Sequence, residues 1–280
     1  MSRTVAHREP SEDCALLEGD ARVRLAELPA GSFQTCVTSP PYWSLRDYGI
    51  AGQIGLETSL PAYLESLVAV FAQVRRVLRD DGTLWIDIGD SYTSGNRTWR
   101  APDRKNPVRA MSVRPPTPEG LKPKDLIGVP WRLAFALQDA GWYLRTDVVW
   151  SKPNCQPESV KDRPTRSHEY LFLFGKSERY RYDPTAVRGP NGRNLRTVWE
   201  IPTRPQPDAH GAMYPEELVE PCILLSTDPR DRVLDPFLGS GTTAVTALRL
   251  GRAFTGIELN PEYLAIARRR IGDGFPSTKR

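Results

Sequence analysis

Two consecutive prolines, Pro40 and Pro41, come shortly after an apolar segment that covers residues 33–37. The apolar segment predicts the end of a buried strand. Neither proline can continue a sheet ladder or lie inside a helix, so the chain has to leave the strand as a fixed, extended loop. That loop carries the hydroxyl of Ser39, the carbonyl of Pro40 and the ring of Tyr42. These groups suit a flat ring that bears an amino group, because two oxygens can accept its N–H bonds while Tyr42 stacks on it.

The same stretch also fits a purely structural interpretation. In that interpretation the prolines form a turn, and Tyr42 and Trp43 belong to the core. The short motif by itself leaves both interpretations open, and a second motif near the C-terminus changes the balance between them.

Hydrophobic periodicity along the 280 residues predicts an α/β protein, with enough chain for one large domain. Strands are predicted at 14–18, 33–37, 83–88, 143–150, 170–174, 232–235 and 253–258. Helices are predicted at 21–28, 60–78, 130–140, 215–225, 244–250 and 261–271. The first elements follow the order strand, helix, strand, which is typical of a βαβ unit.

Two basic segments, residues 91–124 and 176–207, interrupt this pattern. Both are rich in Pro, Gly and Arg and show almost no apolar periodicity, which predicts long loops. In the second segment arginines alternate with Tyr180, Tyr182 and Trp199, a mixture that suits nucleic acid through phosphate contacts and stacking. A solvated, charged surface fits the composition of each segment as well.

Other classes of protein find little support. No apolar run of 18 residues and no signal peptide are present, which predicts a soluble, cytoplasmic protein without a membrane partner. The four cysteines form no C-x-x-C pair and there are only three histidines, so we expect neither a metal site nor a disulfide framework.

The second motif, residues 235–243 with the sequence DPFLGSGTT, lies between a predicted strand and a predicted helix. Its glycines allow the backbone to approach a ligand, and the helix N-terminus attracts a carboxylate or a phosphate. Glu258 ends the next strand, where doubly wound folds hold ribose hydroxyls. The missing Gly-Lys-Ser/Thr argues against a P-loop. Spacing alone leaves NAD and S-adenosylmethionine open.

Together the two motifs resemble those of the amino-group DNA methyltransferases of the permuted "beta" order, in which the catalytic motif precedes the cofactor motif. The Ser-Pro-Pro-Tyr form looks most like the cytosine-N4 branch. Further matching stretches cover nearly the whole chain, among them Gly19-Asp20, Asp47-Tyr48-Gly49, Gly89-Asp90-Ser91-Tyr92, Trp150-Ser151-Lys152-Pro153-Asn154, Arg163-Pro164-Thr165, His168-Glu169-Tyr170 and Gly256-Ile257-Glu258.

The resemblance implies one methyltransferase domain over residues 1–280, built on a doubly wound, mostly parallel, seven-stranded sheet with helices on both faces. It implies transfer of a methyl group from S-adenosyl-L-methionine to the N4 amino group of a cytosine flipped out of double-stranded DNA. Residues 91–124 and 176–207 would then be DNA-recognition elements. A monomer or homodimer is expected, beside a restriction endonuclease that acts separately.

The resemblance also implies the roles of individual residues. The target base would be held by Ser39, Pro40, Pro41 and Tyr42. Asp20 would lie near the adenine amino group of the cofactor, and Glu258 would take the ribose hydroxyls. The full set of expected cofactor residues is Asp20, Thr38, Asp235, Pro236, Phe237, Gly239, Ser240, Gly241, Thr242, Thr243, Glu258 and Asn260. The expected DNA contacts are Trp43, Arg97, Arg100, Arg104, Lys105, Lys152, Arg163, Arg166, Arg193 and Arg196.

Three alternatives remain. Adenine-N6 methylation uses related motifs, usually with Asp or Asn in place of Ser39. Cytosine-C5 methylation uses a Pro-Cys nucleophile, and Pro221-Cys222 is such a pair, but it lies in an apolar helical run, so we predict that Cys222 is a core residue. A protein of another class would bind nucleic acid without catalysis and keep a vestigial cofactor pocket. No residue is identifiable as a general base, so we expect catalysis to rest on in-line positioning.

Overall fold

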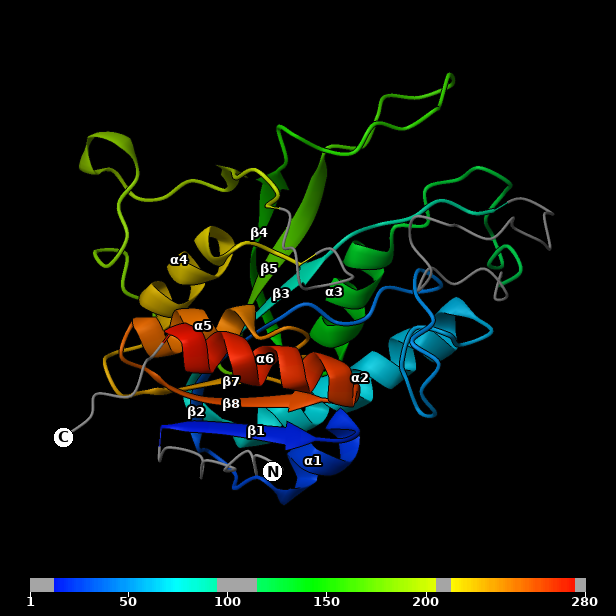
Figure 1. Ribbon diagram of the computed structural model, residues 1–280. Helices are drawn as coiled ribbons and strands as arrows, with labels where there is room; N and C mark the ends of the chain where they lie inside the picture. The colour runs from blue at the N-terminus through cyan, green and yellow to red at the C-terminus, as the bar shows by residue number, and fades with distance from the viewer. Residues whose placement is uncertain (1–12, 95–114, 205–212, 275–280) are drawn as a thin grey trace, which may run out of the picture.

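An eight-stranded sheet organises the residues that the computed structural model describes, which are 13–94, 115–204 and 213–274 (Figure 1). The strands are β1 (Cys14–Glu18), β2 (Phe33–Thr38), β3 (Leu78–Ile88), β4 (Tyr143–Ser151), β5 (His168–Gly175), β6 (Val198–Glu200), β7 (Arg232–Asp235) and β8 (Ala253–Glu258). They lie in the order β1-β8-β7-β2-β3-β5-β4-β6. Neighbours run parallel except β5, which is antiparallel to β3 and β4. The predicted doubly wound, mostly parallel sheet is confirmed.

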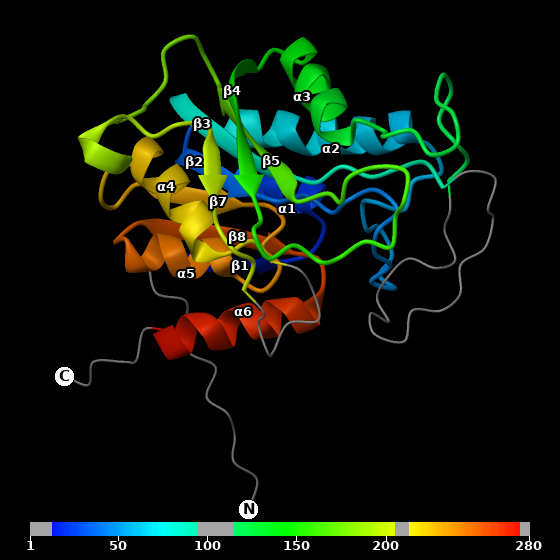
Figure 2. The same ribbon diagram turned by 90° about the horizontal axis from the view of Figure 1, so that it is seen from above.

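Helices cover both faces of this sheet, as the view from above in Figure 2 shows. They are α1 (Ala21–Glu27), α2 (Leu60–Val77), α3 (Val129–Asp139), α4 (Glu216–Ser226), α5 (Thr242–Arg249) and α6 (Pro261–Gly274). The first three pack on one face and the last three on the other. A strand covered on both faces has no side open to water, and all six residues of β2 are accordingly buried.

The longest helix, α2, illustrates how the sequence specifies these elements. A stripe of buried side chains recurs every three or four residues and faces the core, at Leu60, Tyr63, Leu67, Phe71 and Val74. Ser59 caps the first turn, where its hydroxyl accepts a hydrogen bond from the backbone N–H of Ala62 at 3.3 Å.

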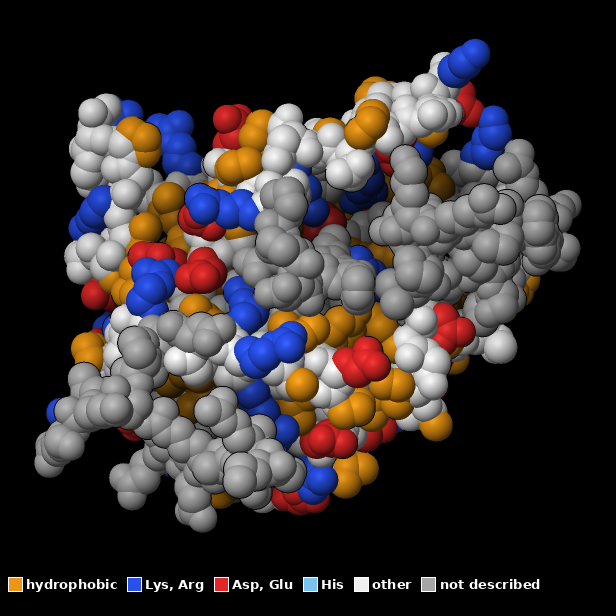
Figure 3. All heavy atoms as spheres, in the orientation of Figure 1, with side chains coloured by type: hydrophobic (Ala, Val, Ile, Leu, Met, Phe, Trp, Pro, Cys, Tyr) orange, Lys and Arg blue, Asp and Glu red, His pale blue; other side chains and the backbone are white. Residues whose placement is uncertain are grey.

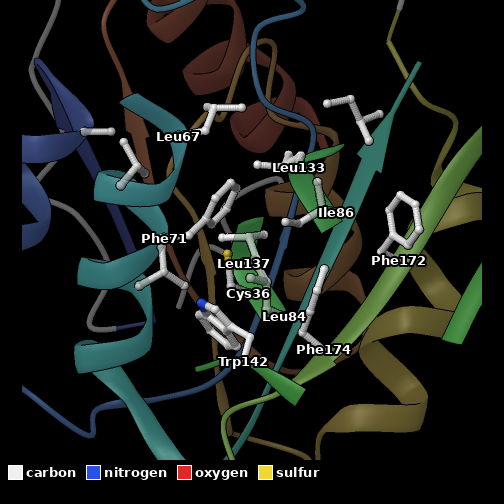
Figure 4. Packing of buried hydrophobic residues seen from close by; sticks show 14 of the residues in the cluster. Cys36, Leu67, Phe71, Leu84, Ile86, Leu133, Leu137, Trp142, Phe172 and Phe174 are labelled. Atoms are coloured by element: carbon white, nitrogen blue, oxygen red, sulfur yellow. The ribbon is translucent and has the colours of Figure 1, made fainter. Parts of the chain in front are cut away.

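The core on this face joins two helices to a central strand. Figure 4 shows Phe71 of α2 and Leu133 and Leu137 of α3 beside Leu84 and Ile86 of β3. All five side chains are buried. Each such burial stabilises the fold by about 1.5–3 kcal/mol. This packing holds β3 rigidly in the sheet, and with it the carboxyl end of the strand.

Cys222 lies in the core on the opposite face. Its side chain is fully buried, and its thiol donates a hydrogen bond to the Leu218 carbonyl at 3.2 Å. Burial raises the pKa of this thiol well above its ordinary value. The prediction that Cys222 is a core residue is confirmed, and an inert, buried thiol does not suit a nucleophile.

The sheet differs from the prediction at two places. β6 lies inside the segment 176–207, which we predicted as a loop, and its pairing with β4 gives eight strands instead of seven. Three residues are too few to show an alternating pattern. β3 begins at Leu78 rather than at residue 83, because its first part is polar and largely exposed and so resembles a loop.

None of the described helices is long and apolar enough to cross a membrane.

Candidate active site

The segment after β2 carries the residues predicted to hold a base. Tyr63 of α2 donates a hydrogen bond to the carbonyl of Pro41 at 2.8 Å and so ties the proline pair to the core. Ser39 and Tyr42 are half-buried, and Pro40 is buried between them. The loop therefore has a fixed backbone, with a hydroxyl and a phenol ring at the carboxyl edge of the sheet.

Trp43 does not lie where we expected. Its side chain is only 5 % exposed, its indole N–H donates to the carbonyl of Glu57 at 3.0 Å, and its ring packs on Tyr63. The prediction that Trp43 contacts DNA is wrong. The loop directs Tyr42 into the site and the next residue into the core.

Charged side chains surround the ring of Tyr42. Its hydroxyl donates to Glu169 Oε2 at 2.9 Å, and the other carboxylate oxygen of Glu169 pairs with Lys152 Nζ at 2.5 Å. The ring also passes close to the backbone at Gly89, where an added Cβ would lie 2.8 Å from Tyr42 Cε2. We predicted Lys152 as a DNA contact, whereas it lies within the active site.

Asp87 lies beside this group, near the end of β3. Its side chain is 3 % exposed, and its Oδ1 atom has no hydrogen-bond partner. Burial, and next the charge of Glu169, raise the pKa of Asp87 well above its ordinary value, whereas Lys152 lowers it. A single acid within an apolar run was the sequence signal for this residue, and our sequence reasoning missed it.

A short hydrogen bond joins the catalytic segment to the cofactor motif. The hydroxyl of Thr38 donates to Asp235 Oδ1 at 2.6 Å, across 197 residues of sequence. Asp235 also accepts from the hydroxyls of Thr243 at 2.7 Å and Tyr214 at 3.1 Å and from the backbone N–H of Phe237 at 3.1 Å.

Thr38, Asp235 and Thr243 are each almost completely buried. These three residues therefore hold the cofactor loop in place through buried hydrogen bonds. We expected them to contact the cofactor directly, and their burial corrects this expectation. Tyr214, just before α4, is a further member of this group that our sequence reasoning missed.

The glycine-rich loop follows β7 and opens α5. Gly239 and Gly241 have φ values of 55° and 88°, in the left-handed region that favours glycine. At Gly239 an added Cβ would approach only the Phe237 carbonyl, at 4.0 Å, so a ligand can lie close to this backbone. At Gly241 it would lie 2.9 Å from Cβ of Ala267 on α6, so the helix packs directly on the loop.

Glu258 connects this loop to the end of β8. Its two carboxylate oxygens accept from the backbone N–H groups of Gly239 and Asn260, both at 2.7 Å. Burial raises the pKa of Glu258, and these two backbone hydrogen bonds lower it. Each carboxylate oxygen can accept more than one hydrogen bond, so both remain suited to a pair of ribose hydroxyls.

Asp20 lies at the same edge, because Glu18 of β1 pairs with Glu258 of β8. Asp20 caps α1 by accepting from the backbone N–H of Arg22 at 2.8 Å, and it forms an ion pair with the same residue. Hydrogen bonds from Arg22 lower the pKa of Asp20 below its ordinary value. The acids at the ends of β1 and β8, together with the glycine loop that follows the neighbouring strand β7, fit a nucleoside with a charged amino-acid tail.

Ser240 and Thr242 are held in place by a side chain of α6. Arg270 of α6 donates from Nη1 to the Ser240 carbonyl at 2.9 Å, the Ser240 hydroxyl at 3.0 Å and the Thr242 hydroxyl at 3.2 Å. Both loop side chains are largely buried. Pro236 and Asn260 flank this loop, and their contact with the cofactor stays a prediction.

The predicted DNA contacts divide into three groups. Arg97, Arg100, Arg104 and Lys105 lie outside the described residues. Arg163 and Arg166 have partners in the structure: the former pairs with Glu158 at 2.7 Å and lies over the ring of Tyr92, and the latter faces Asp90 at 3.7 Å. Arg193 and Arg196 are exposed.

Two loops project on either side of the upper edge of the sheet in Figure 1. One is the β4–β5 connection, residues 152–167, and the other contains the 3-10 turn Pro190–Gly192. Figure 3 shows Lys and Arg side chains on both loops. Within the described part of the chain, no group of three or more His, Cys, Asp or Glu residues is arranged to hold a metal ion.

Known DNA methylases match this chain in sequence. The DNA methylase family N6_N4_Mtase matches residues 33–269. The chain is 62% identical over 272 residues to the Type II methyltransferase M.Cfr9I of Citrobacter freundii, covering 95% of this chain and 91% of the relative. It is 58% identical over 264 residues to the Type II methyltransferase M.SmaI of Serratia marcescens, covering 92% and 90%.

Solved structures share this fold. The PvuII DNA methyltransferase (cytosine-N4-specific) superposes with a TM-score of 0.73 at 22% identity, covering 93% of this chain and 87% of the other. A putative DNA modification methylase from Thermus thermophilus, solved in complex with S-adenosyl-L-methionine, superposes with a TM-score of 0.67 at 27% identity, covering 94% and 95%.

Proposed function

Since the chain belongs to the N6/N4 family of DNA methylases, whose cofactor is S-adenosyl-L-methionine, we propose that it methylates the N4 amino group of cytosine in double-stranded DNA. The sequence Ser39-Pro40-Pro41-Tyr42 supports the choice of cytosine. The observation that carries methyl transfer is the Thr38–Asp235 hydrogen bond of 2.6 Å. It places the Ser39-to-Tyr42 loop directly beside the cofactor loop, so a base held by one lies next to a methyl donor held by the other.

The target base has to leave the duplex, because its amino group is paired inside the stack. The phenol ring of Tyr42 then stacks on the base. The hydroxyl of Ser39 and the carbonyl of Pro40 accept hydrogen bonds from its amino group. These bonds favour a nitrogen lone pair that points out of the ring plane, toward the cofactor.

The cofactor supplies an electrophilic methyl group on its sulfonium. The chain contributes orientation, which in well-aligned reactions accounts for about 7–11 kcal/mol of the barrier. On the cofactor side, Glu258 takes the ribose hydroxyls and the Gly239–Gly241 backbone receives the amino-acid tail. Asp20 lies toward the adenine.

Two features support double-stranded DNA as the substrate. Basic side chains lie on the two projecting loops, where they can contact phosphates on either side of the active site (Figure 3). The relatives are Type II methyltransferases, which supports a role beside a separately acting restriction endonuclease. We assign DNA recognition to the segments 91–124 and 176–207 of a single domain.

Mass spectrometry of nucleosides tests the choice of base. Purified protein, S-adenosyl-L-methionine and unmethylated DNA are incubated, and the DNA is digested and weighed as nucleosides. We expect N4-methylcytosine. N6-methyladenine would keep the fold and the cofactor but overturn the choice of base, and no methylated nucleoside on several DNAs would overturn the activity.

Variants test the assignment of the site. We expect Ser39→Ala and Tyr42→Ala each to reduce methyl transfer at least a hundredfold, while Cys222→Ala keeps the activity of the folded enzyme. Unchanged turnover in the first two variants would refute the role of this loop. Loss of activity in a folded Cys222→Ala protein would reopen cytosine-C5 chemistry.

A further inference from the structure

The ring of Tyr42 is held by a chain of charged groups from two other strands. Its hydroxyl donates to Glu169, the second residue of β5, at 2.9 Å. Glu169 pairs in turn with Lys152, the residue after β4, at 2.5 Å. The antiparallel register of β4 and β5, with Trp150 opposite Glu169, brings these side chains together.

We propose that Glu169 and Lys152 are positioning residues, which hold the phenol ring of Tyr42 in the orientation that stacks on the target base. This proposal rests on the proposed function, because it takes the stacking role of Tyr42 from there. A ring that is already fixed loses less conformational freedom when the base arrives, so binding and alignment are both favoured.

The geometry leaves the ring little other freedom. Gly89 lies against one edge of the ring, where even a Cβ would come within 2.8 Å of Tyr42 Cε2 and 3.2 Å of the Glu169 carboxyl carbon. Glu169 holds the hydroxyl end. Contacts at the edge and at the tip together define the plane of the ring.

Lys152 supplies the positive charge that pairs with Glu169 in this arrangement. The side chains of Lys152 and Glu169 are 15% and 21% exposed, so both charges are largely removed from water. A carboxylate that is largely removed from water is costly unless a positive charge pairs with it. Lys152 Nζ, at 2.5 Å from Glu169, supplies this charge and keeps Glu169 available as an acceptor for Tyr42.

Lys152 is itself fixed in place. Its ammonium nitrogen lies 3.9 Å from the centre of the Trp150 ring, a favourable cation–π distance. A lysine held by a carboxylate and an indole differs from the mobile lysine expected of a phosphate contact, and the two roles can be separated by experiment.

The test measures single-turnover methylation of DNA by the full-length protein with saturating S-adenosyl-L-methionine. We expect Tyr42→Phe and Glu169→Gln each to lower the rate about tenfold, the usual scale for a hydrogen bond to a charged group. A phenylalanine at position 42 cannot donate, and a glutamine at position 169 offers only an uncharged acceptor, so both substitutions remove the same charge-assisted hydrogen bond. The double variant should therefore be no slower than the slower single variant. Lys152→Met should behave like Glu169→Gln, and Lys152→Arg should restore part of the rate.

Three controls separate positioning from a general loss of structure. The affinity for S-adenosyl-L-methionine should stay within twofold of the parent in every variant. Glu27→Gln, which removes an exposed ion pair with Arg24 on α1, should leave the rate unchanged. If Glu169→Gln folds poorly, Glu169→Asp keeps the charge but shortens its reach, and the same tenfold loss is expected.

Several outcomes would overturn the proposal. A double variant about a hundredfold slower than the parent would show that Glu169 acts independently of Tyr42. A Lys152→Met variant that loses DNA affinity with a smaller salt dependence would make Lys152 a phosphate contact. An inactive Tyr42→Ala beside a fully active Glu169→Gln would refute positioning alone. A fully active Tyr42→Ala would instead refute the stacking role of Tyr42, which the proposal takes from the proposed function.

Discussion

Gly89 is the residue whose lack of a side chain matters most to the candidate active site. An added Cβ would lie 2.8 Å from Tyr42 Cε2 and 3.2 Å from the carboxyl carbon of Glu169. We expect Gly89→Ala to displace the Tyr42 ring, lower the methylation rate at least tenfold and destabilise the fold by about 1–3 kcal/mol. Rate measurements and urea unfolding of the purified variant check both effects.

Gly272 provides a matched control for this substitution. It lies in α6, and an added Cβ there would meet nothing within 4 Å. Gly272→Ala should therefore keep full activity and gain up to about 1 kcal/mol of stability from its higher helix propensity. Equal losses in the two variants would show that the effect at Gly89 is not one of local packing.

Asp87 predicts a pH dependence of stability. Its pKa is raised, mainly by burial, so the folded protein keeps a proton that the unfolded chain releases above about pH 4. The free energy of unfolding then falls as the pH rises from that value toward the folded pKa. Asp87→Asn has no proton to release, so this fall should be absent.

We therefore expect the free energy of unfolding of Asp87→Asn, relative to the parent, to increase between pH 4 and pH 8. The increase should be about 1.4 kcal/mol for each unit by which the pKa of Asp87 is raised. Urea unfolding of both proteins across this range measures it. Parallel curves would mean that Asp87 is ionised in the folded protein.

At the scale of elements, α6 supports the cofactor loop from behind. Ala267 packs against Gly241, and Arg270, one turn further along, donates three hydrogen bonds to Ser240 and Thr242. The helix thus restrains a loop whose glycines give it little stiffness of its own.

We expect Arg270→Ala to weaken the binding of S-adenosyl-L-methionine about tenfold, because the loop would no longer be held in its binding conformation. The neighbouring Arg269 is exposed, and Arg269→Ala should bind the cofactor as the parent does. Calorimetric titration measures both affinities. Unchanged binding by Arg270→Ala would show that the packing of α6 alone holds the loop.

At the scale of the whole molecule, the sheet order places the two motifs side by side. β2 and β7 are neighbours although they lie at opposite ends of the chain, and their carboxyl ends meet at one edge of the sheet. This is where ligands of doubly wound sheets bind. The loop of residues 152–167, which joins the end of β4 to the start of β5, projects beyond the same edge (Figure 1).

This arrangement predicts the salt dependence of DNA binding. Arg193 and Arg196 are exposed in the loop around the 3-10 turn Pro190–Gly192. Loss of each phosphate contact reduces the slope of log K against log salt by about 0.9. We expect the double variant Arg193→Ala/Arg196→Ala to reduce this slope by about 2.

A control comes from α1, which lies at the opposite end of the molecule in Figure 1. The variant Arg24→Ala on this helix should leave the slope unchanged. An unaltered slope in the double variant would exclude this loop from the DNA contacts.

Most elements of the fold could be predicted because they are specified locally. The buried stripe of α2 and the unbroken apolar run at residues 170–174 of β5 mark their own positions. β6 could not be found in this way, since its three residues become a strand only by pairing with β4. The prediction for Trp43 failed for a related reason. Tyr42 and Trp43 both carry aromatic rings that can stack on a base, and only the path of the backbone decides which ring faces the site.

The sequence by itself determined the fold class, the family and the two motifs, because periodicity and motif spacing are properties of short stretches of chain. Only the tertiary structure decided which side chains meet. Thr38 and Asp235 are 197 residues apart, and Glu169 reaches Tyr42 and Lys152 through the register of β4 and β5. A hydrogen bond depends on distances of about 3 Å, and such distances between remote residues exist only after the sheet has formed.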